Sequence, residues 1–122
     1  MRSTWIEYKG KKIFYQDFSK NFFNSAAVKT ELDEVQKIVS AQPLNSVLVL
    51  SDFRDTNVGS DLLTAMNAAS TATKAHVQKT AVLGVTGMKR KLADLLTALT
   101  GQPLKYFDDI ESAKNWLAEG QE

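Results

Sequence analysis

The stretch Val47-Leu48-Val49-Leu50-Ser51-Asp52-Phe53-Arg54-Asp55-Thr56 decides the fold of this chain. It begins as an unbroken apolar run and ends in charged and hydroxyl side chains, just before a helical pattern starts. A short apolar run bounded by turn residues is typical of a strand buried on both faces of a sheet. In open α/β sheets, ligands and partners bind at the loops that follow the carboxyl ends of such strands. We therefore expect the functional edge of the protein to lie just after this strand.

Before this strand, the pattern predicts a hairpin and then one helix. Residues 5–8 and 12–18 are rich in aromatic and β-branched side chains, and a short glycine-containing turn separates them, as in an antiparallel hairpin. Capping residues at 21–25 predict a helix that runs to about Ser40. Its expected buried stripe repeats at helical spacing and consists of Val28, Leu32, Val35 and Val39.

After the strand, a second helix and a second buried strand are expected. Asn57 or Ser60 is predicted to cap the helix, which ends near Lys74. A short apolar run at 80–85 predicts the strand. The side chains of the helix that are expected to face the core are Leu62, Leu63, Met66 and Ala69.

The last part of the chain predicts a helix over 88–99, a strand over 104–107 and a final helix. Asp108, with Glu111 three residues later, has the spacing of a capping box at the start of that final helix. Strands that alternate with helices after a hairpin predict an α/β fold with a mostly parallel sheet of about five strands, flanked by about four helices. We expect residues 1–122 to form one such domain.

Composition limits the classes of function. The 122 residues are 43% hydrophobic and 24% charged, as in ordinary globular domains, and the net charge of +1 gives no support to a nucleic-acid surface. There is no cysteine and one histidine, His76, so thiolate and multi-histidine metal sites are excluded. We expect no metal and no cofactor, and we interpret His76 as a surface residue rather than a catalytic base.

The start of the chain carries several charges within its first turns of sequence, which no signal-peptide apolar region would tolerate. No apolar run approaches the roughly 20 residues that a membrane-spanning helix needs. We therefore expect a cytoplasmic protein with no membrane span. The charged residues in question are Arg2, Glu7, Lys9, Lys11 and Lys12.

The first candidate site surrounds the end of the central strand. Its side chains could contact a partner protein, and the exposed amides of a helix start favour anions. The alternative is that these residues only form the turn and cap the helix while the arginine neutralises the acids. The residues are Asp52, Arg54, Asp55, Thr56, Asn57 and Ser60.

A second candidate site adds the loop after the next strand. If the two strands are neighbours, Thr86, Gly87 and Lys89 lie beside Arg54 and Thr56, and together they could hold a phosphate or a carboxylate. The alternative is a threonine cap next to a solvated basic helix face. Neither GxGxxG nor GxxxxGK[ST] occurs in the chain.

The third candidate is the outer face of the second helix. Between Asp61 and Lys74 this helix carries no charge, and its outer positions include Thr64, Ala68 and Thr71. A contiguous face of small neutral residues lets another surface approach closely, so it could dock a partner or a second copy of the chain in a homodimer. The alternative is simply an alanine-rich helix, because alanine is the best helix former.

Two enzyme-like patterns can be tested on spacing. The aspartates at 52 and 55 are one residue too far apart for the DxDx[TV] motif of haloacid-dehalogenase phosphatases, and we reject that interpretation. A receiver domain with a phosphoacceptor aspartate fits Asp52, Thr86 and Lys105 in order. It also requires an acidic pair for magnesium after the first strand, where this chain offers Glu7 and an isolated Asp17. The receiver stays a distant alternative.

The order of elements and three segments resemble the anti-sigma-factor-antagonist fold, called STAS-like, and in particular a bacterial group of small STAS-like proteins. The segments are residues 5–13, 46–52 and 81–87 (WIEYKGKKI, SVLVLSD and AVLGVTG). The resemblance covers nearly the whole chain and implies a non-enzymatic signalling or binding module. A related superfamily binds lipids in an apolar cavity.

The resemblance also implies a phosphorylation site. In the antagonist family, a partner kinase phosphorylates a serine at the start of the helix after the central strand, within Asp-Ser-Ser-Gly-Leu, and that helix docks on the kinase. This chain reads NVGSDL over residues 57–62 instead, so Ser60 is the nearest match and Thr56 the second. We therefore expect a regulatory module that binds a protein partner; the alternative is a small-ligand, anion or lipid binder.

Overall fold

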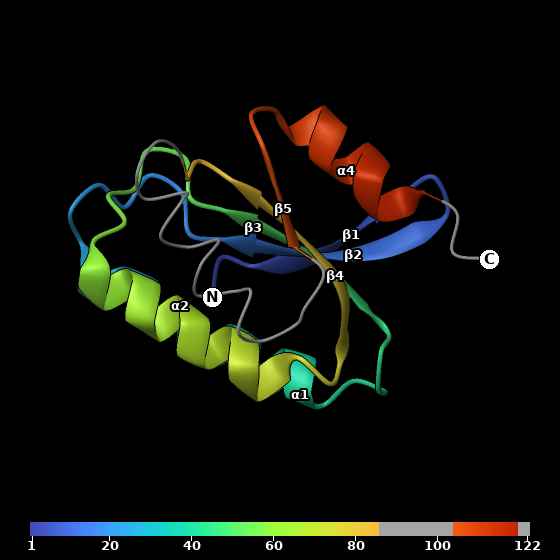
Figure 1. The fold of residues 1–122 in the computed structure, drawn as a ribbon, viewed down its shortest axis with the longest axis horizontal. Helices are drawn as coiled ribbons and strands as arrows, with labels where there is room; N and C mark the ends of the chain where they lie inside the picture. The colour runs from blue at the N-terminus through green and yellow to red at the C-terminus, as the bar shows by residue number, and fades with distance from the viewer. Residues whose placement is uncertain (86–103, 120–122) are drawn as a thin grey trace.

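A single five-stranded sheet forms the centre of the fold (Figure 1). The computed structural model describes residues 1–85 and 104–119. The strands lie across the sheet in chain order; the first pair is antiparallel and every later pair is parallel. They are β1 (Thr4–Tyr8), β2 (Lys11–Asp17), β3 (Val47–Asp52), β4 (Val77–Leu83) and β5 (Leu104–Phe107).

Helices cover both faces of the sheet in this part of the chain. α1 (Ser25–Ser40) and α2 (Ser60–Thr73) pack together on one face, and α4 (Ile110–Ala118) lies on the other (Figure 1). Successive side chains of β3 alternate between these layers: Val49 packs in the cluster with α1 and α2, and Leu50 in the cluster with α4. All of β3 is buried, as predicted for a central parallel strand. The predicted α/β fold is confirmed.

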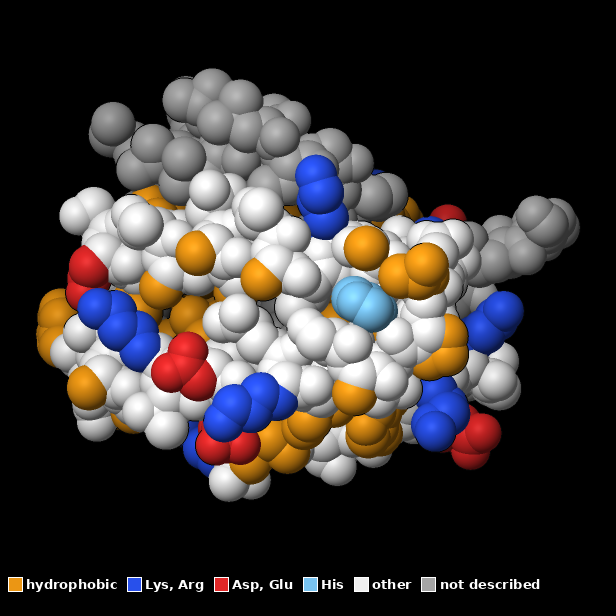
Figure 2. Space-filling model, turned by 90° about the horizontal axis from the view of Figure 1, so that it is seen from below, with side chains coloured by type: hydrophobic (Ala, Val, Ile, Leu, Met, Phe, Trp, Pro, Cys, Tyr) orange, Lys and Arg blue, Asp and Glu red, His pale blue; other side chains and the backbone are white. Residues whose placement is uncertain are grey.

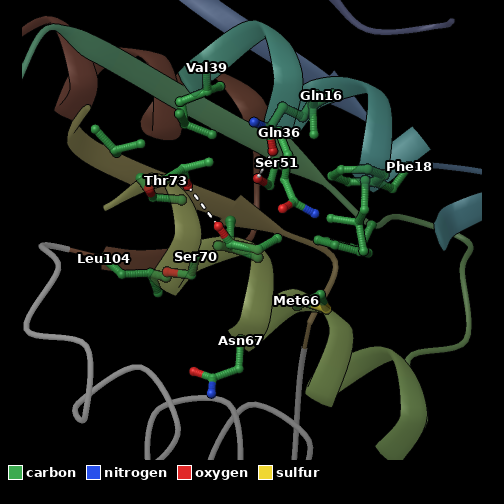
Figure 3. A pocket seen from close by; sticks show the side chains of 18 of the residues that line it. Gln16, Phe18, Gln36, Val39, Ser51, Met66, Asn67, Ser70, Thr73 and Leu104 are labelled. Atoms are coloured by element: carbon green, nitrogen blue, oxygen red, sulfur yellow. Dashed lines mark hydrogen bonds between the residues drawn. The ribbon is translucent and has the colours of Figure 1, made fainter. Parts of the chain in front are cut away.

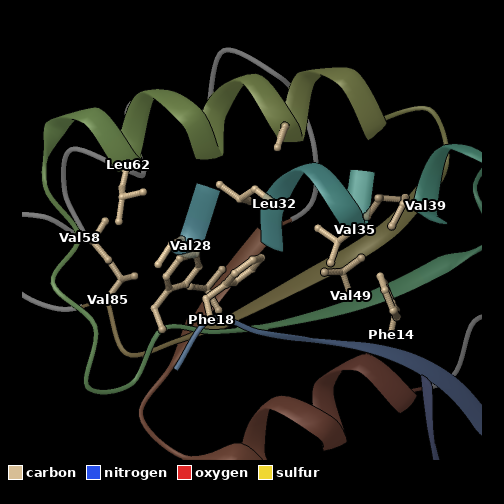
Figure 4. Packing of buried hydrophobic residues seen from close by; sticks show 14 of the residues in the cluster. Phe14, Phe18, Val28, Leu32, Val35, Val39, Val49, Val58, Leu62 and Val85 are labelled. Carbon is tan, nitrogen blue, oxygen red and sulfur yellow. The ribbon is translucent and has the colours of Figure 1, made fainter. Parts of the chain in front are cut away.

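The larger core lies between the sheet and the helices α1 and α2 (Figure 4). Burying one such side chain contributes about 1.5–3 kcal/mol, so this layer supplies much of the folding free energy. The rings of Phe18 and Phe53 stack at 4.8 Å between centroids, just beyond the ends of β2 and β3. The predicted stripe of α1 is confirmed, because all four of its members are buried: Val28, Leu32, Val35 and Val39.

Several elements lie within one residue of the bounds that the sequence predicted. The hairpin β1–β2 and the strand β5 are confirmed. Helix α1 begins within the predicted capping region, where Asn24 Oδ1 accepts a hydrogen bond from Ala27 N at 3.1 Å. The three helices described are one fewer than the four expected; the fourth, predicted over 88–99, lies outside the described residues.

The predicted starts of three elements were wrong, and the first two are those of β4 and α2. Strand β4 begins at Val77 instead of residue 80, because Val77 pairs with Val47 although the next two side chains are polar and half-buried. The N-cap of α2 is Gly59 rather than Asn57 or Ser60, and no side chain caps this helix.

The start of α4 also differs by one residue from its prediction. Its N-cap is Asp109, not Asp108, and the Asp109 carboxylate accepts a hydrogen bond from Ser112 N at 2.9 Å. The backbone bond lowers the pKa of Asp109, because a donated N–H stabilises the charged form. Because residues 108 and 109 are both aspartates, the sequence alone did not distinguish which of them caps the helix.

Candidate functional site

Two loops distant in the sequence pair with each other at the carboxyl edge of the sheet. We call residues 18–24 and 53–57 the paired loops. Lys20 N donates to Arg54 O at 2.8 Å, and further backbone hydrogen bonds before and after this one continue the β2–β3 pairing past the strand ends. In Figure 1 the two loops run side by side at the end of the sheet where α2 begins. The loop after the central strand is therefore half of a two-loop structure.

Thr56 joins the two loops through its side chain. Its hydroxyl donates to Phe18 O at 2.6 Å and accepts from Asn21 N at 3.0 Å. The hydroxyl was predicted as a partner contact and as a second phosphoacceptor. Since it already has a partner on each side, a phosphate on this oxygen would remove the bond to Phe18 O.

Asp52 is the most deeply buried charge in the described residues. Its Oδ1 accepts from Arg54 N and Arg54 Nε, both at 3.0 Å, and its Oδ2 accepts from Tyr15 Oη at 2.6 Å and from Arg54 Nη2 at 2.7 Å. Burial raises the pKa of Asp52, but the hydrogen bonds from Arg54 and Tyr15 outweigh it, so the pKa lies below its usual value. The carboxylate is thus ionised and fully satisfied inside the protein.

The burial of Asp52 corrects two expectations. Its side chain is 0% exposed, so Asp52 offers no surface to a partner and acts by fixing Arg54. A receiver phosphoacceptor needs an accessible carboxylate with free oxygens, and this one is covered and accepts four hydrogen bonds. The receiver interpretation is therefore overturned. In addition, no group of three or more acidic or histidine side chains within residues 1–85 and 104–119 could hold a metal ion.

The hydrogen bonds at Asp52 also shift the pKa values of its two partners, Arg54 and Tyr15. The bond to Asp52 raises the pKa of Arg54, so that guanidinium stays charged. Burial and the bond to Asp52 both raise the pKa of Tyr15, so that phenol stays protonated. The Arg54 side chain is 46% exposed, and it presents a rigid, half-exposed cation at the protein surface.

The remaining predicted residues of this loop are at the surface. Asp55, Asn57 and Ser60 are exposed, and Ser60 is the first residue of α2. Asp55 has a φ of 58°, in the left-handed region that aspartate tolerates better than most residues. The structure therefore brings Arg54, Asp55, Asn57 and Ser60 together on one exposed rim.

Two residues of this site, Phe22 and Phe23, were not predicted from the sequence; we call them the aromatic pair. They are 62% and 85% exposed. Phe22 N donates to Asp55 O at 2.9 Å, and Asn57 N donates to Phe22 O at 2.6 Å, so the pair is fixed beside the rim. Phe22 has a φ of 51°, which for a bulky residue stores about 1–3 kcal/mol of backbone strain. The available signal in the sequence was that two adjacent phenylalanines lie in a loop, between a strand and a helix cap.

A brace from the start of the chain holds the first paired loop. The Arg2 guanidinium donates to Asp17 Oδ1 at 3.1 Å, to Ser19 O at 2.6 Å and to Asn21 Oδ1 at 3.2 Å. On α1, the carboxylate of Glu31 is 8% exposed and accepts hydrogen bonds from the backbone of residues 2–3. Arg2 thus supports the loop that carries the aromatic pair, and Glu31 holds the backbone around Arg2 in place.

The outer face of α2 is exposed and uncharged, as the sequence suggested. Thr64, Ala68 and Thr71 are all exposed. Figure 2 shows this side of the molecule, with uncharged side chains across its middle and charged ones mostly toward its edges. At the first turn of α2, Asp61 forms an ion pair with Lys29 of α1 at 3.4 Å.

The end of β4 lies against the rim. Gly84 has a φ of +87°, and a Cβ placed there would lie 2.4 Å from Arg54 N. The ends of β3 and β4 are therefore neighbours, as the prediction of an anion site required. Thr86, Gly87 and Lys89 of that prediction lie outside the described residues.

A small cavity of about 90 Å³ lies between the sheet and the inner faces of α1 and α2 (Figure 3). Its walls are mostly apolar. On its floor, Ser51 Oγ donates to Gln16 Oε1 at 3.0 Å, and both residues are less than one tenth exposed. Met66, Ala69 and other inner residues of α2 form one wall, so this helix separates the cavity from the exposed face.

Comparison with known proteins identifies the family. Within the described residues no helix is both long and apolar enough to cross a bilayer. Searches of curated proteins and of solved structures each found no match. A family model described as SpoIIAA-like matches residues 13–118. That match spans most of the sequence and agrees with the STAS-like fold, and the chain therefore belongs to the SpoIIAA-like family.

Proposed function

We propose that this chain is a non-enzymatic regulatory module that binds a partner protein through the exposed rim and the outer face of α2. The observation that carries the proposal is the exposed, uncharged face formed by Thr64, Ala68 and Thr71. Uncharged side chains cost less free energy to remove from water than charged ones, whereas rim charges orient an approaching partner. Membership of the SpoIIAA-like family supports a STAS-like regulatory role. The cytoplasmic location stays a prediction.

Ser60 is the position at which we propose regulation by phosphate. It is exposed at the first turn of α2, where backbone N–H groups and the helix dipole favour negative charge. Thr56 is the weaker candidate because its hydroxyl holds the paired loops together. Mass spectrometry of protein purified from the native host tests this: phosphate on Ser60 supports the proposal, and phosphate only elsewhere contradicts it.

Site-specific crosslinking tests the docking face. A photo-crosslinking amino acid is placed at Ala68 on α2 and, as a matched control, at the exposed Lys37 on α1. We expect one discrete product from position 68 and none from position 37. A product at twice the chain mass identifies a second copy as the partner. Crosslinks confined to α1 would contradict the proposal.

A second candidate function is the binding of a small apolar molecule in the cavity. A volume of about 90 Å³ is well below the roughly 300–1,000 Å³ of typical ligand pockets, so it favours a small ligand over a lipid. A thermal-shift screen tests it, because a ligand at 100 times its Kd adds about 2.7 kcal/mol of stability. The screen also includes phosphates and carboxylates, which test the anion site at Arg54.

A further inference from the structure

The aromatic pair is the most exposed apolar feature beside the proposed docking face. Of the large hydrophobic side chains that are exposed in residues 1–85 and 104–119, only Phe22 and Phe23 are adjacent in sequence; Met1 and Leu44 lie elsewhere. An apolar side chain that is mostly exposed contributes little hydrophobic stabilisation to the folded chain. Aromatic residues, phenylalanine included, are enriched in protein interfaces relative to the rest of the surface.

The backbone under the pair is held in a strained form. Phe22 adopts a φ of 51°, which glycine or asparagine would adopt more easily, and the residue is 62% exposed. Turn geometry therefore does not explain a phenylalanine at this position. Backbone strain at an exposed side chain is a feature of binding sites, where the surroundings hold the residue ready for its partner.

The backbone of Phe22 is held in place before any partner arrives. Hydrogen bonds connect Phe22 to both Asp55 and Asn57, and the Arg2 brace fixes the preceding residues. Ordering a loop on binding reduces affinity, so a loop that is already ordered favours tight and specific association. The fixed loop places the pair next to the rim and the first turn of α2.

The charges around the pair favour a protein over a bilayer or a nucleic acid. Lys20 and Arg54 are cations, whereas Asp55 on the paired loop is an anion, and all three are exposed. An anionic membrane or nucleic acid selects surfaces dominated by lysine and arginine. A rim that carries both signs matches a protein surface with carboxylates and cations around an apolar pocket.

We propose that Phe22 and Phe23 are the apolar anchors of the docking surface, and that they insert into an apolar pocket of a partner protein whose rim carries both signs of charge. This inference rests on the proposed function, because it extends the same surface from α2 to the paired loops. It adds the residues that would supply most of the affinity, since a few central aromatic side chains dominate typical interfaces.

The test begins with crosslinkers at Phe23 and at Ala68, with the exposed Leu44 as a matched control. The polypeptide crosslinked from position 68 is purified. The Kd of its complex is then measured with the wild-type chain, with Phe22→Ser/Phe23→Ser and with Leu44→Ser. We expect the same polypeptide from position 23, at least a 10-fold weaker Kd for the double variant, and less than a twofold change for Leu44→Ser. Circular dichroism confirms that each variant is folded.

A second variant separates the ring from the backbone. Phe22→Asn keeps the left-handed conformation with less strain, so we expect a raised melting temperature together with a weaker Kd. If position 68 yields a partner whose Kd the double variant leaves unchanged, the inference fails and the proposed function stands. If neither position yields a partner, both fail. Binding to vesicles of phosphatidylcholine and phosphatidylserine that the double variant abolishes, without a protein crosslink at position 23, would also overturn the inference.

Discussion

The carboxylate of Asp52 has no contact with solvent, yet each of its oxygens accepts two hydrogen bonds. A buried ion pair of this kind contributes little net stability compared with an apolar replacement, but removing one partner leaves the other uncompensated. Arg54 gains a fixed geometry from it, because three of its nitrogens bind the same carboxylate. Asp52 therefore positions a surface cation from inside the protein.

The substitution Asp52→Asn tests this arrangement. We expect the free energy of unfolding to fall by about 1–3 kcal/mol at pH 7, because an amide loses the charged acceptor and turns a donor toward existing donors. The pKa of Asp52 is lowered in the folded state, so its contribution is present above the unfolded pKa of about 3.9 and is lost as the pH falls through the folded value. The difference between wild type and variant should therefore shrink below about pH 4.

Urea unfolding at a series of pH values from 7 to 3 provides the measurement. Asp33→Asn, at an exposed position on α1, is the matched control and should change stability by less than about 0.5 kcal/mol. A difference for Asp52→Asn that is the same at pH 7 and pH 3 would show that its charge does not matter.

At the scale of elements, the paired loops connect the two ends of the site. They contain little regular structure, but they continue the β2–β3 pairing and bring the aromatic pair beside the rim. One hydroxyl, that of Thr56, supplies two of the bonds between them. The rigidity of the site thus depends on a few identifiable polar contacts.

Thr56→Val removes those two bonds with little change in shape. Phe18 O and Asn21 N then lose their partner, and we expect the free energy of unfolding to fall by about 1–3 kcal/mol. The amide of Asn21 should also exchange its hydrogen faster. The same substitution at the exposed Thr64 is the control, with an expected change within about 0.5 kcal/mol. Equal exchange rates at Asn21 in wild type and variant would argue against the role of Thr56.

The sequence predicted the elements well because each element follows from local pattern. The apolar run of β3 and the stripe of α1 identify themselves by spacing alone. The prediction of the α2 cap was wrong because Asn57 and Ser60 both look like caps in isolation, whereas the helix begins at Ser60 and its N-cap is Gly59. The burial of Asp52 was missed for a related reason: a polar residue at a strand end looks exposed until its partners are known.

The aromatic pair was not predicted because its exposure depends on non-local contacts. In the sequence, Phe22 and Phe23 read as ordinary apolar residues before a helix. Their exposure depends on a positive φ and on pairing with residues more than thirty positions away, which no local pattern contains. The exposed face of α2 was predicted because a helix displays its outer side chains at a regular period.

At the scale of the whole molecule, the sheet depends on close contact between neighbouring strand ends. Gly84→Ala would place a Cβ 2.4 Å from Arg54 N and 2.5 Å from Phe53 C, at a φ of +87°. We expect a loss of about 2–5 kcal/mol, from overpacking together with an unfavourable φ. Gly10→Ala is the matched control: its φ is +79°, but nothing lies within 4 Å, so about 1–2 kcal/mol is expected.

Urea unfolding of both variants measures the difference between them, which isolates the close approach from the effect of φ. A larger loss for Gly84→Ala shows that β4 and the rim are tightly packed against each other. Losses that are equal in the two variants would mean that the structure relaxes around the added methyl group.

The order of the strands, β1-β2-β3-β4-β5, has a consequence for synthesis on the ribosome. Each strand joins the edge left by the strand translated just before it, and no described strand must later insert between two others. A nascent chain can therefore extend its sheet in one direction as it emerges, beginning with the hairpin, whose contacts are the most local. Until β3 has been made, β2 leaves its parallel-pairing edge open, and an open strand edge can pair with another chain and aggregate.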